Sequence, residues 1–306
     1  TFMQTAENWL EYCAGEMKRA GLFFGHGTDN AHDEAAWMVL HVLEAPLDGS
    51  FANWDIPLNE TQAEALEELL ARRINERRPL AYLTGKARFC GLEFIVSPQV
   101  LIPRSPLAEL ITEQFSPWLN FNEGSRVLDM CTGGACIAIA MAIWIPECTV
   151  DAVDISGEAL EIASKNVQLH SVGDRVNLIH SDLFEAVDKT AYDLIVSNPP
   201  YVSKGVFDQL PEEYRAEPKS GLLCGEDGLD IVLKLLDAAP GYLQPEGILI
   251  AEVGESAETL FEFLPRVSFT WLEFDKGGDG VFLLEYDQLI ACQPDVRDLL
   301  EQRKYV

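Results

Sequence analysis

The chain has 306 residues, 50 of them acidic and 22 basic, so its formal net charge is −28. Binding to nucleic acid or to an anionic membrane surface relies on lysine and arginine, so this charge argues against both classes of protein. An apolar content of 48%, with six Trp and fifteen Phe to bury, excludes a disordered chain. The length suits one large domain or two unequal ones.

Cysteines, histidines and apolar runs indicate the compartment. Seven cysteines are scattered without a Cys-x-x-Cys pair, which predicts reduced thiols in a cytoplasmic protein rather than disulfides or a zinc site. The five histidines lack the spacing of metal ligands, so no metal is expected. The longest apolar run, Cys136 to Ile145, is shorter than the ~20 residues that cross a bilayer, so no membrane partner is expected either.

Residues 5 to about 80 are expected to form helices, because apolar side chains such as Trp9, Cys13 and Met17 recur at helical spacing. Short strands are then expected at Arg88 to Val96 and at Val100 to Ile102. A helix is expected from Ser105 to Leu119.

After Gly124 the pattern alternates between strands and helices, which is typical of a parallel sheet covered on both faces. The candidate strands are Arg126–Met130, Thr149–Val153, Val176–His180, Leu194–Ser197, Gly247–Val253, Phe269–Phe274 and Val281–Glu285. The glycine-rich link Lys276 to Gly280 predicts that the last two form an antiparallel hairpin. The predicted class is α/β, with a helical domain at 1–85, a hairpin-and-helix linker at 86–123, the sheet domain at 124–292 and an acidic tail at 293–306.

A glycine-rich turn follows the first strand of this sheet. The segment reads Val127-Leu128-Asp129-Met130-Cys131-Thr132-Gly133-Gly134-Ala135-Cys136 and leads into a helix of small residues. Glycines let the backbone approach a ligand at the carboxyl edge of such a sheet. The turn therefore favours a small-molecule site, and the alternative is an ordinary strand-to-helix crossover.

Acidic residues follow the next two strands. Asp154 lies 21 positions after Gly133, where a carboxylate accepts hydrogen bonds from ribose hydroxyls. The alternative is that Asp154 or Ser156 caps the following helix. Asp182 is placed to accept a hydrogen bond from an adenine amine, and the alternative is a simple turn residue.

The segment Asn198-Pro199-Pro200-Tyr201 directly follows the fourth strand and is the most specific signal in the chain. Two prolines remove two backbone donors and fix the backbone, which leaves the Pro199 carbonyl without a ladder partner. That carbonyl and the Asn198 side-chain oxygen match the two N–H bonds of a planar –NH₂ group. Tyr201 supplies a flat ring that can stack on such a group.

Together these motifs resemble the class I S-adenosylmethionine-dependent methyltransferases that modify glutamine amides. One branch of that family acts on release factors and the other on large-subunit ribosomal protein three. This sequence is similar to the ribosomal-protein branch from about residue 5 to residue 292. The segments that carry the resemblance are Arg88 to Phe94, Leu101 to Pro106, Asp129 to Gly133, Ser181 to Phe184, Asn198 to Tyr201 and Trp271 to Gly280.

The resemblance implies a Rossmann-like sheet domain that catalyses methyl transfer and an N-terminal helical domain that recognises the substrate. It implies S-adenosylmethionine as cofactor, S-adenosylhomocysteine as product, and no metal. The implied catalytic residues are Asn198, Pro199, Pro200 and Tyr201. The implied cofactor-binding residues are Asp129, Thr132, Gly133, Gly134, Asp154, Asp182, Leu183 and Asn198. The implied partner is a basic ribosomal protein, which an acidic enzyme would attract.

The glycine turn departs from the family pattern Thr-Gly-Ser-Gly-Cys, because Ala135 stands at the second family glycine. If that position needs a positive φ or a bare Cα against the cofactor, the methyl group of Ala135 would weaken cofactor binding.

Three other functions are weighed against amide methylation of the ribosomal protein. Enzymes that methylate exocyclic amines of RNA or DNA bases share the Asn-Pro-Pro-Tyr motif but need a basic track for phosphates. The basic residues Arg72, Arg73, Arg77 and Arg78, with Arg88 and Arg104, are interpreted as cations near a helix C-terminus, and the alternative is contact with ribosomal RNA. A release factor is the other amide substrate, and a non-catalytic nucleotide-binding protein would not need the motif.

Overall fold

The computed structural model describes residues 5–304, which form two compact units. The N-terminal unit comprises residues up to Pro98 together with Ile102–Arg104 and Pro211–Glu217, and the C-terminal unit contains the rest. This division is discontinuous along the chain, whereas the sequence pattern predicts contiguous domains. All seven cysteines are free thiols. Among the described residues no helix is both long and apolar enough to span a bilayer.

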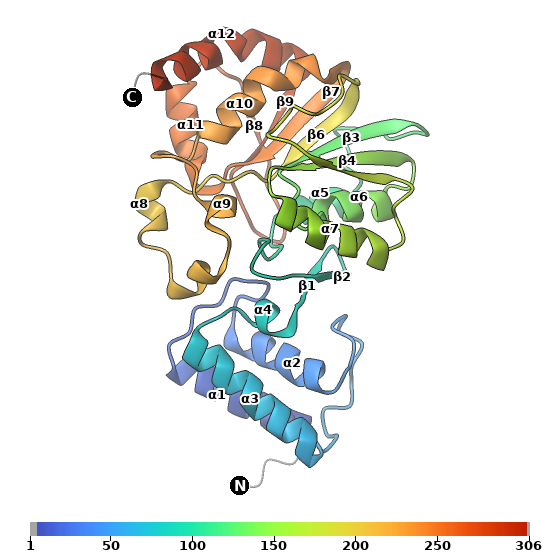
Figure 1. Ribbon diagram of the computed structural model, residues 1–306, viewed down its shortest axis with the longest axis vertical. Helices are drawn as coiled ribbons and strands as arrows, with labels where there is room; N and C mark the ends of the chain where they lie inside the picture. Colours follow the sequence, from blue (N-terminus) through green and yellow to red (C-terminus); the bar gives the residue numbers. More distant parts are fainter. Residues whose placement is uncertain (1–4, 305–306) are drawn as a thin grey trace. The chain divides into compact units, whose positions relative to one another are not determined.

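The N-terminal unit is built on four helices and a hairpin (Figure 1). Their bounds are α1 (Ala6–Arg19), α2 (Ala31–Val42), α3 (Glu60–Glu76), α4 (Leu80–Thr84), β1 (Lys86–Phe89) and β2 (Leu92–Ile95). Capping boxes start α1 at Thr5 and α3 at Asn59, since each side chain accepts a backbone N–H of the first turn. Trp9, Met17 and Leu66 lie in the apolar core that the helices share, as the helical spacing predicts.

Two expectations for the segment after α4 are wrong. Arg88 to Val96 is not one strand, because β1 and β2 turn back on each other at Cys90 and Gly91, both of which have positive φ. Val100 to Ile102 forms no strand, and the backbone N–H of Ile102 instead donates to the Glu217 carboxylate at 3.1 Å.

The C-terminal unit contains a seven-stranded sheet, as predicted. The strands are β3 (Ser125–Met130), β4 (Cys148–Asp154), β5 (Val176–His180), β6 (Tyr192–Ser197), β7 (Leu243–Glu252), β8 (Thr270–Trp271) and β9 (Val281–Glu285). Their order is β5-β4-β3-β6-β7-β9-β8. The pairs among β3 to β7 are parallel, whereas β9 is antiparallel to both β7 and β8, which confirms the predicted hairpin.

Helices cover both faces of this sheet (Figure 1). On one face lie α5 (Leu107–Thr112), α6 (Cys136–Trp144) and α7 (Gly157–Leu169), and on the other α10 (Asp230–Ala238) and α12 (Tyr286–Arg303). An apolar core lies between the sheet and α10 and α12, with Leu249 and Phe282 in the same cluster as Leu233 and Leu289. Such two-sided burial explains the near-continuous apolar strands.

The remaining elements are short or lie near the C-terminus. They are α8 (Lys204–Phe207), η1 (Glu212–Ala216), α9 (Lys219–Leu222), η2 (Ala239–Gly241), η3 (Gly254–Ser256) and α11 (Ala257–Phe263). The helix predicted from Ser105 to Leu119 is limited to α5, because Gln114 and Phe115 adopt positive φ directly after it. Most of the predicted acidic tail is the second half of α12, where Val296 is fully buried.

Candidate active site

The strand register brings the predicted site residues to one edge of the sheet. Met130 pairs with Val153 on one side and with Ser197 on the other, so the glycine turn, Asp154 and Asn198 all follow at the same level. Asp182 follows β5, the next strand outward. These carboxyl ends of parallel strands are where open α/β sheets bind ligands.

Asp129 is fully buried at the end of β3 and keeps one oxygen without a partner. Its Oδ2 accepts hydrogen bonds from the Thr132 hydroxyl at 2.6 Å and from the Ala138 backbone N–H at 3.1 Å. Among the described residues, nothing donates to Oδ1. Burial raises the pKa of Asp129 to about 7. A cationic ligand donor beside Oδ1 would satisfy this atom and favour the carboxylate.

Asp154 supports the glycine turn. Its Oδ2 accepts the backbone N–H of Gly133 at 2.8 Å, and its Oδ1 accepts that of Ser156 at 2.9 Å. The residue that caps α7 is Ser156, whose hydroxyl accepts the N–H of Ala159 at 3.1 Å. Burial raises the pKa of Asp154. The carboxylate thus orients the turn, and each of its oxygens keeps a lone pair with which it can accept from a ligand.

The first glycine of the turn borders open space. Gly133 has a φ of +55°, and a Cβ placed on it would meet no protein atom within 4 Å. Gly134 is packed instead, because its carbonyl accepts a 3.0 Å hydrogen bond from the Asn166 side chain. The turn therefore leaves room for a ligand against Gly133, as the sequence predicts for a backbone cradle.

Ala135 has the left-handed backbone that the family glycine would allow, with a φ of 63° and a ψ of 25°. The residue is fully buried, at 0% exposure, so its methyl group packs inside the protein rather than lining the open space beside Gly133. The steric reason for a weakened cofactor affinity is therefore absent, and only the backbone strain remains.

Asp182 and Leu183 follow β5. The Asp182 side chain is exposed, and Leu183 adopts a φ of 48°. At the same edge of the sheet, Ile155 directly follows Asp154 and is 61% exposed. Ile155 was not among the residues expected at this edge, although its position directly after the acidic end of a strand could have marked it.

The Asn198-Pro199-Pro200-Tyr201 segment directly follows β6 and presents two hydrogen-bond acceptors. Among residues 5–304, neither the Asn198 side chain nor the Pro199 carbonyl has a hydrogen-bond partner. Asn198 is half-buried and Pro199 is buried, so both groups are held on a rigid backbone. This arrangement can receive the two N–H bonds of one planar amide or amine.

The Tyr201 hydroxyl is bound by a residue that sequence reasoning missed. It donates to Oε1 of Glu252, the last residue of β7, at 2.9 Å. The signal available in the sequence was a carboxylate that directly follows the apolar run from Ile248 to Ala251.

The predicted basic cluster forms no open track of free cations in the described part of the chain, because Arg72 and Arg78 pair with Glu76 near the surface and other members turn inward. Arg73 is 1% exposed, with Nε 2.5 Å from Oε1 of Glu34, and it also donates to the Phe23 carbonyl at 2.8 Å. Nη2 of Arg77 lies 2.8 Å from Oε1 of Glu213. Arg73 lies in the last turn of α3 and Arg77 at its C-cap, as the helix C-terminus interpretation predicts. Their ion pairs with carboxylates, buried for Arg73 and partly buried for Arg77, were not anticipated.

Arg104 also pairs with a carboxylate. Its guanidinium donates two hydrogen bonds to the carboxylate of Glu217, at 2.8 and 2.9 Å. Nε2 of the buried His26 lies 3.0 Å from the same carboxylate. Burial raises the pKa of Glu217, but the adjacent His26 side chain and the Arg104 guanidinium outweigh burial and lower it.

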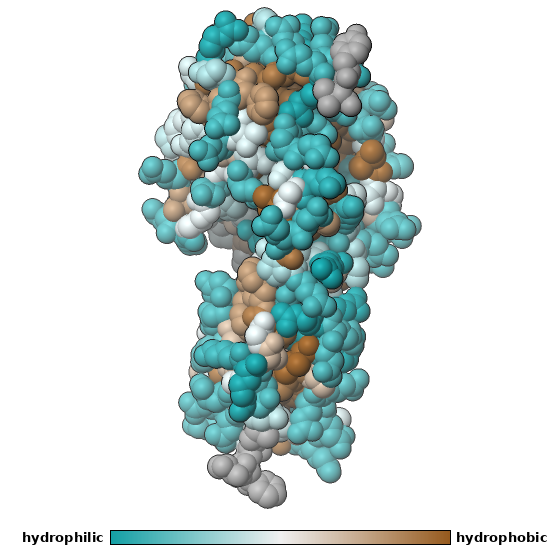
Figure 2. Space-filling view, turned by 90° about the vertical axis from the view of Figure 1, so that its left-hand side faces the viewer, coloured by the Kyte–Doolittle hydropathy of each residue, from teal (hydrophilic) through white to brown (hydrophobic). Residues whose placement is uncertain are grey.

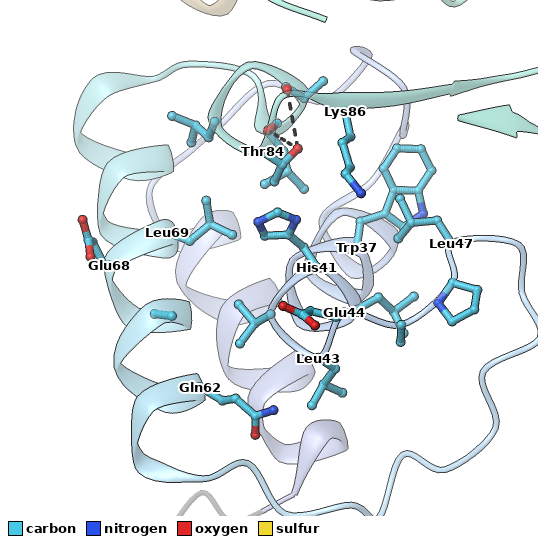
Figure 3. A pocket seen from close by; sticks show the side chains of 18 of the residues that line it. Trp37, His41, Leu43, Glu44, Leu47, Gln62, Glu68, Leu69, Thr84 and Lys86 are labelled. Atoms are coloured by element: carbon cyan, nitrogen blue, oxygen red, sulfur yellow. Dashed lines mark hydrogen bonds between the residues drawn. The ribbon is translucent and has the colours of Figure 1, made fainter. Parts of the chain in front are cut away.

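The N-terminal unit also has a hollow of about 1040 Å³ between α2, α3 and α4, and it contains none of the predicted site residues. His41 and Lys86 point into it beside Trp37 and Leu69 (Figure 3). Burial and the nearby Lys86 charge lower the pKa of His41. Within the described part of the chain, no group of His, Cys, Asp and Glu side chains is arranged to hold a metal.

Family models match both parts of the chain. The PrmC N-terminal domain matches residues 18–85, and the methyltransferase small domain matches residues 109–212. A solved structure of the hMettl16 catalytic domain in complex with MAT2A 3'UTR hairpin 1 has a TM-score of 0.50 and 17% identity, over 77% of this chain and 85% of that one, and shares the fold. The sheet order, the edge site and these matches define a methyltransferase of the class I fold.

Two curated relatives narrow this class. The chain is 47% identical to the ribosomal protein uL3 glutamine methyltransferase of Xanthomonas campestris pv. campestris, over 98% of this chain and 97% of that protein. It is 46% identical to the protein of the same name from Xylella fastidiosa, over 98% and 96% of the two chains. The chain belongs to the family of ribosomal protein uL3 glutamine methyltransferases.

Proposed function

We propose that this enzyme methylates the side-chain amide nitrogen of a glutamine in ribosomal protein uL3. The observation that carries the proposal is the pair of acceptors on Asn198 and Pro199, which have no hydrogen-bond partner among residues 5–304 and stand in the same rigid segment as Tyr201. The names of the two curated relatives supply the substrate. The net charge of −28 supports attraction to a basic partner.

S-adenosylmethionine fits the edge site as cofactor and, when bound, supplies an activated methyl group. The orphaned Oδ1 of Asp129 suits an ammonium group, and the open space beside Gly133 suits close approach to the backbone. Thr132 and Gly134 complete the turn. Asp154 would accept from ribose hydroxyls, and Asp182, Leu183 and Ile155 would border the base.

We assign to Asn198 and Pro199 the main role in orienting and activating the substrate amide. An amide nitrogen is a poor nucleophile, because its lone pair is delocalised into the carbonyl, so alignment and exclusion of water matter most. The two acceptors would hold both N–H bonds and stabilise the positive charge that develops on nitrogen as its bond to the methyl carbon forms and the bond from that carbon to sulfur breaks, with the electron pair left on sulfur. The nitrogen then loses one proton to water, and no side-chain base is needed beforehand.

The pairing of these arginines with carboxylates argues for a protein substrate over a nucleic acid. Arg73, Arg77 and Arg104 are paired with carboxylates, so they do not offer free charges for a phosphate backbone.

Replacing Asn198 by alanine tests the proposal. We expect Asn198→Ala to lower kcat for labelled-methyl transfer to purified uL3 by roughly 10²- to 10³-fold, while cofactor affinity falls much less. Asn122→Ala is the matched control, because Asn122 is exposed and precedes β3 at the opposite end of the strands.

Three outcomes would contradict the proposal. Equal losses of transfer and cofactor binding would make Asn198 a cofactor residue only. Transfer to free ribosomal RNA or to a release factor, but not to uL3, would assign a different substrate. The uL3 product is checked by mass spectrometry, and a methyl group on any residue other than glutamine would assign a different reaction.

A further inference from the structure

Tyr201 is held by hydrogen bonds to both its side chain and its backbone. Its hydroxyl donates to Oε1 of Glu252 at 2.9 Å, and its backbone carbonyl accepts a 2.6 Å hydrogen bond from the Ser256 hydroxyl. The ring also touches the backbone of Gly254, because a Cβ placed on that glycine would lie 2.5 Å from Cε2 of Tyr201. The ring is therefore fixed in position and in tilt.

Glu252 is itself anchored from a second direction. Its Oε2 accepts a hydrogen bond from the Ser105 hydroxyl at 2.5 Å, and the Ser105 oxygen accepts the backbone N–H of Leu107 at 3.2 Å. Glu252 and Ser105 are 6% and 7% exposed. A carboxylate that receives hydroxyl donors on both oxygens, in a buried site, resists rotation and holds the Tyr201 hydroxyl strongly.

The position of Glu252 on the sheet places it beside the candidate catalytic motif. Ala251 pairs with Ser197 in the parallel register of β7 and β6, so Glu252 follows at the level of Asn198. The carboxylate thus supports Tyr201 at the edge where the substrate amide would bind.

We propose that Glu252 is a positioning residue for methyl transfer, which holds the Tyr201 ring at the angle that orients the substrate amide against Asn198 and Pro199. Ser105 fixes the rotamer of Glu252 and so acts through it. This inference rests on the proposed function, because it assigns the ring the task of orienting that amide.

A double-mutant cycle between Tyr201 and Glu252 tests the inference. Tyr201→Phe removes the hydroxyl and Glu252→Leu removes its acceptor, and each should lower kcat about 10- to 100-fold with little change in cofactor affinity. The double variant should be no slower than the slower single variant, because both changes break the same contact. Glu252→Gln keeps an amide oxygen for Tyr201 and an N–H group for Ser105, so it should recover most of the activity. Glu246→Gln, on the exposed end of β7, is the control.

The measurements separate the two proposals. Wild-type turnover on uL3 is recorded first, and its absence counts against the proposed substrate. If the wild type turns over, multiplicative losses in the double variant overturn the role of Glu252. Parallel losses of cofactor affinity and kcat overturn it as well. Ser105→Ala, which leaves Glu252 and Tyr201 in place, should give a smaller loss of kcat, and a normal melting curve shows that this variant is folded.

Discussion

Oδ2 of Asp154 accepts the backbone N–H of Gly133 at 2.8 Å, and this bond ties the end of β4 to the turn after β3. The carboxylate that is predicted to bind ribose hydroxyls therefore also supports the glycine turn. Its replacement would disturb the turn and the ligand contact together. For this reason Asp129, whose Oδ1 has no donor among the described residues, is the better residue with which to test cofactor binding.

Replacing Asp129 by asparagine should change how stability depends on pH. The folded-state pKa of about 7 is above the ordinary value of 3.8, so the carboxyl is protonated more readily in the folded enzyme. The stabilisation from Asp129 is then complete below about pH 4 and is lost as the pH rises through 7. Because an asparagine side chain does not titrate, the Asp129→Asn variant should gain stability relative to the wild type over that range, by up to about 4 kcal/mol. Urea unfolding of the ligand-free proteins at several pH values measures this difference.

Cofactor affinity should also depend on the ionisation of Asp129, but here the ionised carboxylate is the favoured form. A cationic cofactor favours ionised Asp129, so wild-type affinity should rise between about pH 6 and pH 8, and the Asp129→Asn variant should bind weakly at every pH. Calorimetric titration at each pH checks both trends. A flat wild-type profile would mean that Oδ1 does not meet the cationic group.

Ala135→Gly should leave cofactor affinity within about twofold of the wild type, because the buried methyl does not line the ligand space. Relief of the left-handed strain, worth about 1 kcal/mol, is opposed by the loss of a buried methyl and by the greater freedom of glycine in the unfolded chain, so the free energy of unfolding should change little. Calorimetry and denaturant unfolding test both statements. Tighter binding by the variant would show that the methyl does obstruct the cofactor.

Arg73→Met should lower the free energy of unfolding by about 3–5 kcal/mol, because it leaves the buried carboxylate of Glu34 without its cation. Arg72→Met is the matched control one residue earlier. Arg72 pairs with Glu76 at 3.0 Å on the exposed side of α3, so its loss should cost no more than about 0.5 kcal/mol. Denaturant unfolding followed by circular dichroism compares the two. Similar losses would refute the assignment of a buried ion pair at Arg73.

Added salt should weaken turnover of uL3. The surface in Figure 2 is mainly hydrophilic, in keeping with 50 acidic residues that need solvent. Salt screens such charges beyond about 10 Å at 0.1 M, so kcat/KM for a basic protein should fall about tenfold between low and high salt, with kcat little changed. A short uncharged glutamine peptide is the control substrate. If uL3 and the peptide respond alike, the charge serves solubility only.

The alternation of the sheet and the edge location of the site could be predicted from the sequence. Asp129, Gly133, Asp154 and Asn198 each lie at or after the end of an apolar strand, and strand pairing alone brings such residues to one edge. Their common register is set by backbone hydrogen bonds, which depend little on the side chains that follow.

The supports of the site could not be predicted in this way. Ser105 and Glu252 are 147 positions apart, and Phe23 and Glu213 are 190 apart, so no local pattern links them. Nor does composition show that an arginine points inward. Arg72 and Arg73 are the same residue type at adjacent positions, and they differ only in the side of α3 on which they lie.

The seven residues Pro211–Glu217 belong to the N-terminal unit, although both of their neighbours in the chain belong to the C-terminal unit. Glu213 and Glu217 find their cations there, on Arg77 and Arg104. A chimera that exchanged only the first hundred residues with those of a relative would mismatch these carboxylates with foreign partners. To graft a new N-terminal unit onto this enzyme, three separate segments must therefore be exchanged together: the helices up to Pro98, Ile102–Arg104 and Pro211–Glu217.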